Sequence, residues 1–597
     1  MTTQAASPSN TRWIAATVLA LLLILSAQII HAIHGQSLTW DEDDHIFAGY
    51  EIWKTHDFGF NPEHPPMVKL LGTLPLLPLH LTVPPLQNRF FKTEAYLDGR
   101  EFLFRNGPAN GKPYSAETLV FRARLPTLLF TLAAALLVFF AAREMFNVRA
   151  GLIALTLFCF EPNLLAHGAY VTTDMAASCT IFATIYFLWR YVQHPTPMRL
   201  AATGLAAGLA LAAKHSTVLL APMLVLLLAG ELIIRAISAR RPRDPQQTTL
   251  PRTALRYAAA VAIITLIGVA ILWAFYGFRY AARPAPLALS PSLTDYVGPL
   301  AGIEARGLLL AARLHLLPES YLYGLADVRK MANDMPSFFL GRVYRHGLWY
   351  YFPVVFVLKS TLAFLAALAL TLFAIARGYL RNRRALWFLI APPALYFAVA
   401  MSSHLNIGAR HILLIWVFGC ALAGAGLSSL IEHNPRWLYA VAALLVLHAA
   451  TSVHASPNYI AYSNEAFGGP TKTYHYLSDS NTDWGQQLLA TSAYLRDRHI
   501  THCYFAYFVT PFVLPTDYGI PCTYIPTPDS TGFGILPNIP ATVDTATDGP
   551  LLISAGDLNY FESGSSVLDP YQSLMNVPPP TPSRTASSSS TAASTSR

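Results

Sequence analysis

The chain has 597 residues, of which 53% are hydrophobic and only 12% are charged, and its mean hydropathy is +0.39. Soluble domains usually carry about 25% charged residues, so this composition excludes an ordinary soluble protein and predicts an integral membrane protein. The net charge of +8 does not indicate nucleic-acid binding, because arginines in loops on one side of the membrane account for it.

Apolar stretches recur along the chain, and a helix needs about 20 such residues to cross a bilayer core. Arg12 precedes the first stretch, which could therefore be a signal peptide, but its length favours a helix that is retained. We expect an α-helical polytopic membrane protein with about 11 transmembrane helices. The candidate spans lie near 13–33, 124–142, 150–166, 174–192, 199–213, 216–236, 257–277, 352–376, 385–401, 410–430 and 437–455.

Basic residues predict the orientation of these helices, because short cytoplasmic loops are enriched in Lys and Arg. With the N-terminus inside, the cytoplasmic loops collect the arginines, whereas the outward loop 161–173 has no Lys or Arg. Three long segments, 34–123, 278–351 and 456–597, are then expected outside the cytoplasm.

Acidic residues follow the first span at once, in the run Trp40-Asp41-Glu42-Asp43-Asp44-His45. The ordinary explanation is a solvated helix start, where acids interact favourably with the helix dipole and Thr39 is the cap. The position of the run favours a functional role, because charge beside a bilayer is costly and tryptophan is typical of the membrane interface. A carboxylate held at that depth is partly desolvated, which makes it a better base.

A second motif, Glu63-His64-Pro65-Pro66-Met67-Val68-Lys69, lies further along the same outer segment. It could be a turn that enters an amphipathic helix, with proline in the first turn. Alternatively, the two prolines fix the chain so that Lys69, about one helical turn later, presents a cation at the membrane surface. A lipid phosphate is the natural partner for that cation.

Further charged residues lie at the outer ends of later spans. Arg124 enters the second span, Asp174 begins the fourth after two threonines, and Lys214 lies between the fifth and sixth. Arg410 and His411 open the tenth span. Each cation alone could snorkel to headgroups. Asp174 could be an ordinary N-terminal helix acid with a threonine cap, or it could bind an acceptor hydroxyl or a metal.

Four cations nevertheless converge on the leaflet that the general bias leaves poor in positive charge: Lys69, Arg124, Lys214 and Arg410. Charged residues beside the bilayer are expensive and mark functional sites. The convergence therefore predicts a ligand that is an anionic lipid.

The region after the last span has a different pattern. Apolar runs beginning at Cys503 and Gly549 are typical of short strands, so we expect a small mixed α/β region. Cys503 and Cys522 could form a disulfide in an oxidising compartment, and no Cys and His spacing typical of zinc appears. We divide the chain into a transmembrane domain (1–455), an extracytoplasmic soluble region (456–576) and a disordered tail rich in Ser, Thr and Pro (577–597).

Turn-forming residues at 463–469 and 479–483 precede Trp484, Gln486 and Gln487. These three side chains could form a platform on which a sugar stacks. They could equally begin a helix that docks the soluble region on the membrane, and we favour this second explanation.

Taken together, Asp41-Glu42, His45-Ile-Phe and His64-Pro-Pro-x-x-Lys69 resemble the first luminal loop of protein O-mannosyltransferases. They also resemble the wider group of membrane glycosyltransferases with the C-type fold, which includes bacterial aminoarabinose transferases. The arginine at the second span and the segments around Asp174 and Arg410 are similar to bacterial members. The chain departs from the eukaryotic mannosyltransferases, because it lacks their extended sugar-binding region and differs after the last span.

This resemblance implies a donor in which a sugar is linked to a polyprenyl phosphate, and an active site outside the cytoplasm. It implies that Asp41 is the catalytic base and that Glu42 assists the base or the acceptor. Lys69 and Arg124 would hold the donor phosphate. To these we add Lys214, Arg410 and His411 as donor-phosphate ligands, and His64 and Asp174 as substrate-binding residues.

We therefore expect an inverting glycosyltransferase that moves a hexose, such as mannose, or a pentose to an acceptor hydroxyl, with protein O-mannosylation as one form of that reaction. The leaving group is already a phosphate, so we expect neither an obligatory metal nor another cofactor. The partners would be the lipid-linked donor, a protein, glycan or lipid acceptor, and membrane lipids, but no nucleic acid. The bacterial likeness favours an inner membrane with a periplasmic site.

Two other classes of protein compete with this prediction. A transporter or flippase of a lipid-linked or anionic solute could use the same outward cations, but it needs polar groups near the bilayer midplane and often has broken helices. A structural subunit that presents the C-terminal region to other proteins would leave the two outer motifs unexplained.

Overall fold

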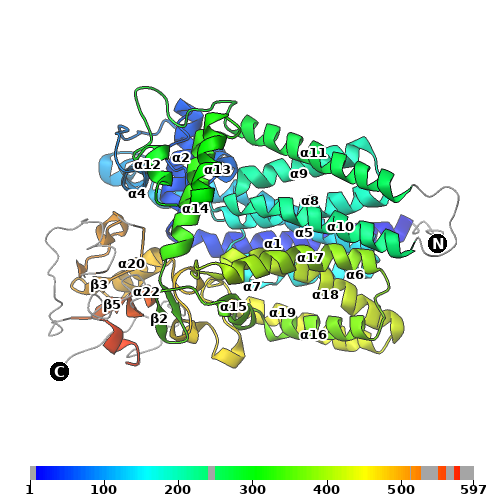
Figure 1. The fold of residues 1–597 in the computed structure, drawn as a ribbon. Helices are drawn as coiled ribbons and strands as arrows, with labels where there is room; N and C mark the ends of the chain where they lie inside the picture. The colour runs from blue at the N-terminus through cyan, green and yellow to red at the C-terminus, as the bar shows by residue number, and fades with distance from the viewer. Residues whose placement is uncertain are drawn as a thin grey trace.

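The computed structural model describes residues 8–238, 249–300, 302–510, 512–525, 527, 549–559 and 571–577. Helices make up most of these residues and form an elongated bundle with irregular and mixed structure gathered at one end (Figure 1). The tail predicted for 577–597 lies, apart from Val577, outside the described residues.

Eight helices in the described ranges are long and apolar enough to cross a membrane. These helices are α1 (Pro8–His34), α5 (Ala116–Met145), α8 (Thr173–Gln193), α10 (Leu220–Ser238), α11 (Leu250–Phe275), α17 (Arg383–Ser402), α18 (Leu413–His433) and α19 (Trp437–Ala455). Their outer faces expose large apolar side chains such as Leu19 and Leu266. The predicted class, an α-helical polytopic membrane protein, is confirmed.

The remaining predicted spans are also helical, but they are short or bent. Helices α6 (Val148–Cys159) and α9 (Pro197–Ala213) are shorter apolar helices, and α15 (Tyr351–Lys359) meets α16 (Leu362–Ala376) at an angle of 112°. A 12-residue helix such as α6 is about 18 Å long, well below the ~30 Å of a bilayer core. In the described part of the chain eight helices qualify by length and composition, or nine with the bent pair, and α6 and α9 are the short candidates near 150–166 and 199–213.

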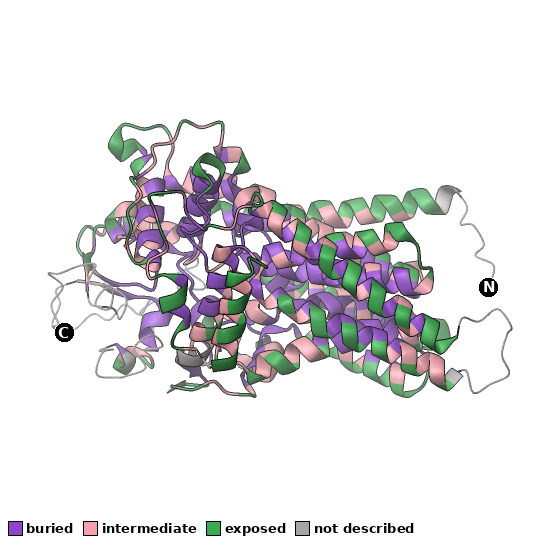
Figure 2. Cartoon of the chain, turned by 45° about the horizontal axis from the view of Figure 1, so that its top comes forward, coloured by how far each residue is buried: buried purple, intermediate pink, exposed green. Residues whose placement is uncertain are grey.

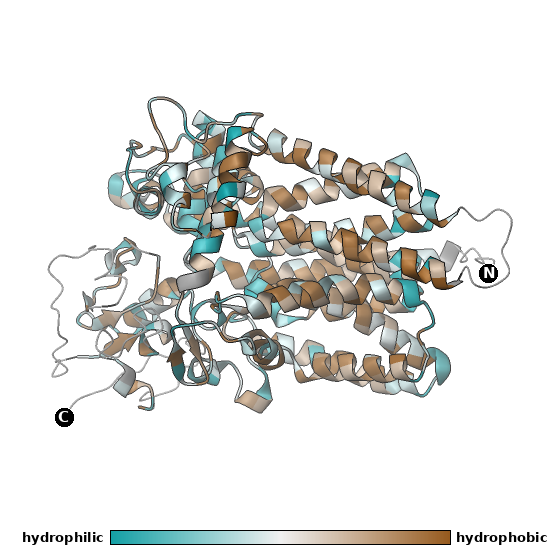
Figure 3. Ribbon diagram, viewed as in Figure 1, coloured by the Kyte–Doolittle hydropathy of each residue, from teal (hydrophilic) through white to brown (hydrophobic). Residues whose placement is uncertain are grey.

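Packing among the helices places α18 in the interior, against α6, α16 and α8, while α9 lies between α8 and α11. The inner faces are buried and the outer faces exposed (Figure 2). Apolar residues dominate the middle of the bundle, and hydrophilic ones collect at its two ends (Figure 3). This distribution is what a bilayer around the middle of the bundle requires.

One end of the bundle, which we call the loop end, carries the outer segments. The first segment folds into α2 (Glu42–Thr55), α3 (Met67–Thr73) and α4 (Phe91–Arg105), and α7 (Pro162–Ala166) precedes α8. The second long segment contributes α12 (Leu293–Val297), α13 (Gly302–Arg313), α14 (Glu319–Asp334) and the antiparallel hairpin of β1 (Ser337–Phe339) and β2 (Arg342–Tyr344). The opposite end, where α5 and α8 finish and α9 and α17 begin, is called the basic end.

The predicted C-terminal region is a small mixed α/β structure at the loop end. Its parallel sheet has the order β4-β3-β5, in which Tyr504 pairs with both Thr523 and Leu551. Cys503 and Cys522 form a disulfide, with their Cα atoms 4.4 Å apart. The bounds are β3 (Tyr504–Ala506), β4 (Thr523–Tyr524), β5 (Leu551–Ile553), α20 (Leu488–Asp497) and α22 (Ala555–Leu558).

Candidate active site

Asp41 occupies the N-cap position of α2, but its side chain makes no capping hydrogen bond. Caps normally use that carboxylate to accept a hydrogen bond from a helix N–H group. Instead, its Oδ2 accepts a hydrogen bond of 2.8 Å from the guanidinium of Arg410. The acid predicted as the base is thus turned away from its own helix and toward a cation from a distant part of the chain.

The predicted residues Asp174, Lys214 and Arg410 meet at the same place. Lys214 donates to one oxygen of Asp174, and the Arg410 guanidinium lies 3.7 Å from the other. Asp174 begins α8, Lys214 follows α9, and Arg410 lies in the 3-10 turn η4 (Ala409–Ile412) that precedes α18. These three helix ends bring Asp174, Lys214 and Arg410 together. With Asp41, the network contains two carboxylates and two cations.

Two nitrogens beside this network have no hydrogen-bond partner among the residues that the structure describes. Within the described part of the chain, Nε of Arg410 and Nε2 of His411 are buried and make no hydrogen bond. A buried polar group without a partner costs free energy, so both nitrogens are available to a ligand. The Arg410 guanidinium also stacks over the buried ring of Trp484, 4.2 Å from its centre. Arg410 therefore covers the ring of Trp484. This favours a role in docking the soluble region on the membrane domain over a platform on which a sugar stacks.

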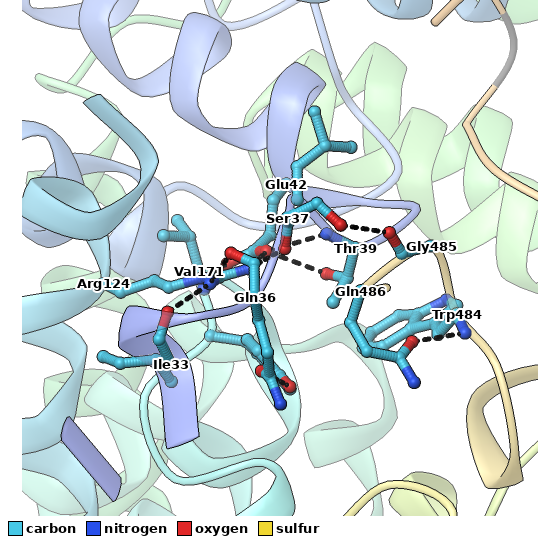
Figure 4. A network of polar contacts seen from close by, with 12 residues as sticks. Ile33, Gln36, Ser37, Thr39, Glu42, Arg124, Val171, Trp484, Gly485 and Gln486 are labelled. Atoms are coloured by element: carbon cyan, nitrogen blue, oxygen red, sulfur yellow. Dashed lines mark hydrogen bonds and ion pairs between the residues drawn. The ribbon is translucent and has the colours of Figure 1, made fainter. Parts of the chain in front are cut away.

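Glu42 and Arg124 form a fully buried ion pair next to Asp41 (Figure 4). Glu42 also accepts hydrogen bonds from the N–H and hydroxyl of Thr39 and from the N–H of Val171. Burial acts to raise the pKa of Glu42, but the charge and hydrogen bonds of Arg124 outweigh it and hold that pKa below its ordinary value. Glu42 therefore stays ionised.

All five N–H groups of the Arg124 guanidinium are occupied. Nε and one Nη2 hydrogen go to Glu42, and the others go to the carbonyl groups of Ile33, Gln36 and Ser37. This arrangement ties the end of α1 and the start of α2 together. Arg124 therefore has no N–H group left for the phosphate that we expected it to hold. In this respect it differs from the other predicted cations.

Lys69 lies on another side of the acidic run. Its ammonium donates to the carbonyl of Asn61 at 2.6 Å and to the Asn61 side chain at 3.0 Å. The Asn61 amide in turn donates to Asp44 at 2.6 Å. Burial, with the charges of Asp43 and Asp41, raises the pKa of Asp44 well above its ordinary range. Lys69 is thus near the site but buried and held by Asn61.

His64 lies between Lys69 and the network that contains Lys214. Its ring meets that of His45 edge to face, with centres 4.7 Å apart. Burial lowers the pKa of His64 well below its ordinary range, and the charges of Lys69 and Lys214 act in the same direction. Burial also lowers the pKa of His45 to about 4. Both imidazoles are therefore neutral at pH 7, and the field from both sides of the site reaches His64.

The second outer segment packs over the His64 motif. Lys92 on α4 pairs with Glu63 at 2.5 Å and with Asp327 on α14 at 3.3 Å. Tyr296 on α12 donates to the same Asp327. Burial raises the pKa of Glu63 to about 7 although Lys92 opposes that shift. These contacts cover the motif from above and fix α14 over it.

Two glycines allow the helices around Asp41 to approach closely. A Cβ on Gly49 of α2 would overlap the Lys69 carbonyl, and a Cβ on Gly99 of α4 would lie 2.8 Å from the Asp43 carbonyl carbon. Real Cβ atoms do not approach backbone this closely. Gly49 and Gly99 are therefore required for α3 and α4 to hold α2.

The C-terminal region supports the same loop from its other side. Trp40 stacks on Phe508, with ring centres 4.7 Å apart, and the Thr510 hydroxyl contacts both oxygens of Asp43. The Ser37 hydroxyl donates to the carbonyl of Gly485 at 2.7 Å. Residues that follow β3 thus bear directly on the run that contains Asp41.

Sequence reasoning missed two members of this site. Asn61, which joins Lys69 to Asp44, gave no signal beyond its place just before the His64 motif. Asp479 lies in a run typical of a turn, and its positive φ of 54° agrees with that, but burial also raises its pKa to about 6 against the opposing charge of Arg410. Among the described residues no group of three His, Cys, Asp or Glu side chains is arranged to hold a metal, and metal independence stays a prediction.

Residues 117–241 match the family model described as dolichyl-phosphate-mannose-protein mannosyltransferase. A comparison with curated proteins gives no match. Among solved structures, ArnT from Cupriavidus metallidurans bound to undecaprenyl phosphate is 14% identical over 92% of this chain and 94% of that chain, with a TM-score of 0.47.

Two other solved structures are similar over smaller parts of the chain. The oligosaccharyltransferase AglB from Archaeoglobus fulgidus, in complex with an inhibitory peptide and a dolichol-phosphate, is 14% identical over 76% of this chain and 56% of that chain, with a TM-score of 0.46. The Saccharomyces cerevisiae Pmt1-Pmt2 protein O-mannosyltransferase complex bound to the sugar donor is 17% identical over 46% and 34%, with a TM-score of 0.33.

The family match covers roughly a fifth of the chain, from the start of α5 to the end of α10. That segment contains Arg124, Asp174 and Lys214. Over that segment the match agrees with the predicted resemblance to membrane glycosyltransferases, and the two outer motifs lie before the matched residues.

Proposed function

We propose that this chain is a glycosyltransferase that moves a sugar from a polyprenyl-phosphate-linked donor to an acceptor hydroxyl at the loop end of the bundle. The observation that carries the proposal is the position of Asp41. Its carboxylate is withdrawn from helix capping and held, with 16% of its side chain exposed, against Arg410. A carboxylate beside a cation at a membrane boundary can accept a proton next to an anionic lipid headgroup.

In the proposed step, Asp41 takes the proton of the acceptor hydroxyl while the hydroxyl oxygen bonds to the anomeric carbon of the sugar. The bond between that carbon and the phosphate oxygen breaks, and its electron pair leaves with the phosphate. The products are the glycosylated acceptor and a polyprenyl phosphate, with inversion at the anomeric carbon. The charge that develops on the phosphate oxygen is stabilised by fixed donors, an effect worth about 10²–10³ in rate for one donor.

Arg410, His411 and Lys214 are the donors we assign to the phosphate. Arg410 and His411 each have a buried nitrogen with no partner in the described residues, and the Lys214 side chain is 13% exposed. Asp174 fixes Lys214 and approaches Arg410. We assign it the role of holding these cations in place.

Glu42 and Arg124 are assigned to positioning rather than to substrate contact. Their buried pair fixes the turn from Ile33 to Glu42 that delivers Asp41. Lys69 and His64 would contribute positive potential and shape from the opposite side of the site. The reaction, in this assignment, takes place between the α8–α18 side and the α2–α3 side.

The orientation that fits this reaction places the loop end outside the cytoplasm. Arginines such as Arg143, Arg190 and Arg383 lie at the basic end, as expected for cytoplasmic loops. The disulfide between Cys503 and Cys522 lies at the loop end, as expected for an oxidising compartment. We propose a bacterial inner membrane with the site in the periplasm and a protein, glycan or lipid as acceptor.

The bent pair α15 and α16 is the feature that a transporter would best explain. Its break lies at the boundary rather than the midplane, because Lys359 donates to the carbonyl groups of Ile460 and Asn481 at 2.6 and 2.8 Å. Asn464 also donates to the Ser360 carbonyl. These partners belong to loops that follow the last span, so the break fastens the bundle to the outer region.

The proposal is tested with the purified protein and defined polyprenyl-phosphate sugars, by measuring the release of polyprenyl phosphate with and without candidate acceptors. Release that depends on the protein and rises with acceptor is expected. Movement of intact donor across vesicles with no cleavage would show a flippase and overturn the proposal.

A further inference from the structure

We infer a second ligand site, for an anionic phosphate-bearing headgroup, at the basic end of the bundle. A cavity of about 420 Å³ lies there, between the ends of α5 and α8 and the starts of α9 and α17. Small-molecule sites commonly have volumes of about 300–1,000 Å³. The inference does not depend on the reaction proposed for the loop end, because the two sites lie at opposite ends of α8.

Two residues that line this cavity carry hydrogen-bond donors for which the described part of the chain provides no partner. Trp189 is only 7% exposed, and in the described residues its indole N–H has no acceptor. Arg199 donates from Nη1 to the carbonyl groups of Arg190 and His194, both at 3.0 Å. This leaves Nε and Nη2 of Arg199 unused among the described contacts. The cavity therefore combines a dry indole donor with a guanidinium fixed by its own backbone neighbours.

Charge in the cavity is positive on balance. Arg190 pairs with Glu144 at 3.3 Å, so these two side chains offset each other. Arg199 has no carboxylate partner within the described ranges. Because the charges of Arg190 and Glu144 offset each other, the guanidinium of Arg199 gives the cavity a net positive charge. This charge favours binding of an anion over binding of a cation. Arginine is also suited to phosphate, because its planar fork donates two parallel hydrogen bonds.

The walls of the cavity are held by contacts outside it. Arg384 donates to the side-chain oxygen of Gln193 at 3.0 Å and makes two hydrogen bonds to the buried Glu231. Among the described contacts, the amide N–H groups of Gln193 are left for a ligand. Asn382 donates to the Met145 carbonyl and caps α17, so it acts as wall rather than ligand. The donors are in place before any ligand arrives, which lowers the entropic cost of binding.

Lipid and soluble phosphates share the chemistry that this cavity recognises. Basic pockets between transmembrane helices on the cytoplasmic side are known to hold anionic lipid headgroups. Arg190 and Arg199 lie at helix ends, as the basic residues of such pockets do. A soluble phosphate compound would satisfy the same donors without an acyl chain. The two sources differ in whether the acyl chains contribute, and this difference can be measured.

The test measures thermal unfolding of the full-length protein in a neutral detergent with added phosphatidylglycerol, phosphatidylcholine or inorganic phosphate. A ligand that binds the folded state raises Tm. The double variant Arg190→Gln/Arg199→Gln is compared with Arg149→Gln, which removes an exposed arginine of the same end that does not line the cavity. Trp189→Phe removes only the indole N–H and keeps an aromatic ring.

We expect phosphatidylglycerol to raise the Tm of the wild type and of Arg149→Gln by several degrees more than phosphatidylcholine does. At least half of that rise should be lost in the double variant, and part of it in Trp189→Phe, each measured from the variant's own baseline. The same pattern with inorganic phosphate alone would identify a soluble ligand. Equal rises in the double variant and in Arg149→Gln would overturn the site.

Discussion

Asp41 and Arg410 form a hydrogen-bonded ion pair of 2.8 Å although 369 residues separate them in the chain. The pair joins the start of α2 to the turn that opens α18, so it links the first outer segment to the deepest helix of the bundle. In the proposed reaction one partner accepts the proton and the other receives the phosphate. Donor binding must therefore compete with this pair.

Replacement of Arg410 by Gln should lower the rate by about 10²–10³, the usual cost of losing one donor to a developing oxyanion. Arg410→Lys keeps the charge but lacks the second nitrogen, so it should recover only part of the rate. Steady-state kinetics with a defined donor lipid measures both effects.

Arg122→Gln is the matched control for Arg410, because Arg122 lies at the same end of the bundle but stacks over Tyr114, away from the site. It should behave like the wild type. Equal losses in the two variants would show that outward positive charge in general, rather than Arg410, is what the reaction needs.

Removal of one partner of the Glu42–Arg124 pair should destabilise the fold by about 3–5 kcal/mol, because a buried charge is left without its partner. Glu42→Gln and Arg124→Met should each lower the Tm, and the double variant should lower it by less than the sum of the two. A double-mutant cycle on thermal unfolding measures this coupling. Additive effects would mean that the two side chains do not act as a pair.

Gly99→Ala should weaken activity through backbone packing alone. The new methyl group would meet the backbone of Asp43 and Asp44 at 2.8–2.9 Å, and such overpacking costs about 1–3 kcal/mol. Since α4 would have to move away from α2, the position of Asp41 would change as well. Gly111→Ala is a useful comparison because nothing lies within 4 Å of its added Cβ, although its positive φ adds a small strain. Activity of Gly99→Ala equal to that of Gly111→Ala would contradict the packing argument.

The stability of the fold should depend on the ionisation of Glu63. Burial raises its pKa from 4.5 to about 7, so the folded state favours the neutral acid. Its contribution is complete below about pH 4.5 and is lost as the pH rises through 7. In Glu63→Gln the side chain is always neutral, so the Tm of this variant should gain on the wild type between pH 5 and 7.5. If the assignment were wrong, the difference in Tm between Glu63→Gln and the wild type would stay constant over this pH range.

Much of the fold follows from composition and periodicity, because apolar length and loop charge depend on local sequence. The helical class and the strands at 504–506 and 551–553 were confirmed for that reason. The bend between α15 and α16 does not follow from the sequence, because the length of an apolar stretch does not show where a helix breaks.

The candidate site divides in the same way. Charge at the outer end of a predicted span can be recognised from the local sequence. This signal identifies Asp41, Asp174, Lys214 and Arg410. Pairing is a property of the tertiary fold, so the sequence could not show that Arg124 is consumed by Glu42 and by the carbonyl groups of the first turn. Asn61 was missed because a neutral amide between two charges leaves no trace in charge or hydropathy.

The most direct measurement is the turnover of Asp41→Asn with a defined polyprenyl-phosphate sugar and an accepted hydroxyl. The amide preserves the size of the side chain but cannot take the proton, so kcat at saturating donor should fall by about 10²–10⁴ while the variant folds as the wild type does. Glu101→Gln, which replaces an acid of the same segment that pairs with Arg105, should retain full activity. Turnover by Asp41→Asn within a few-fold of the wild type at equal protein would contradict the assignment of Asp41 as the base.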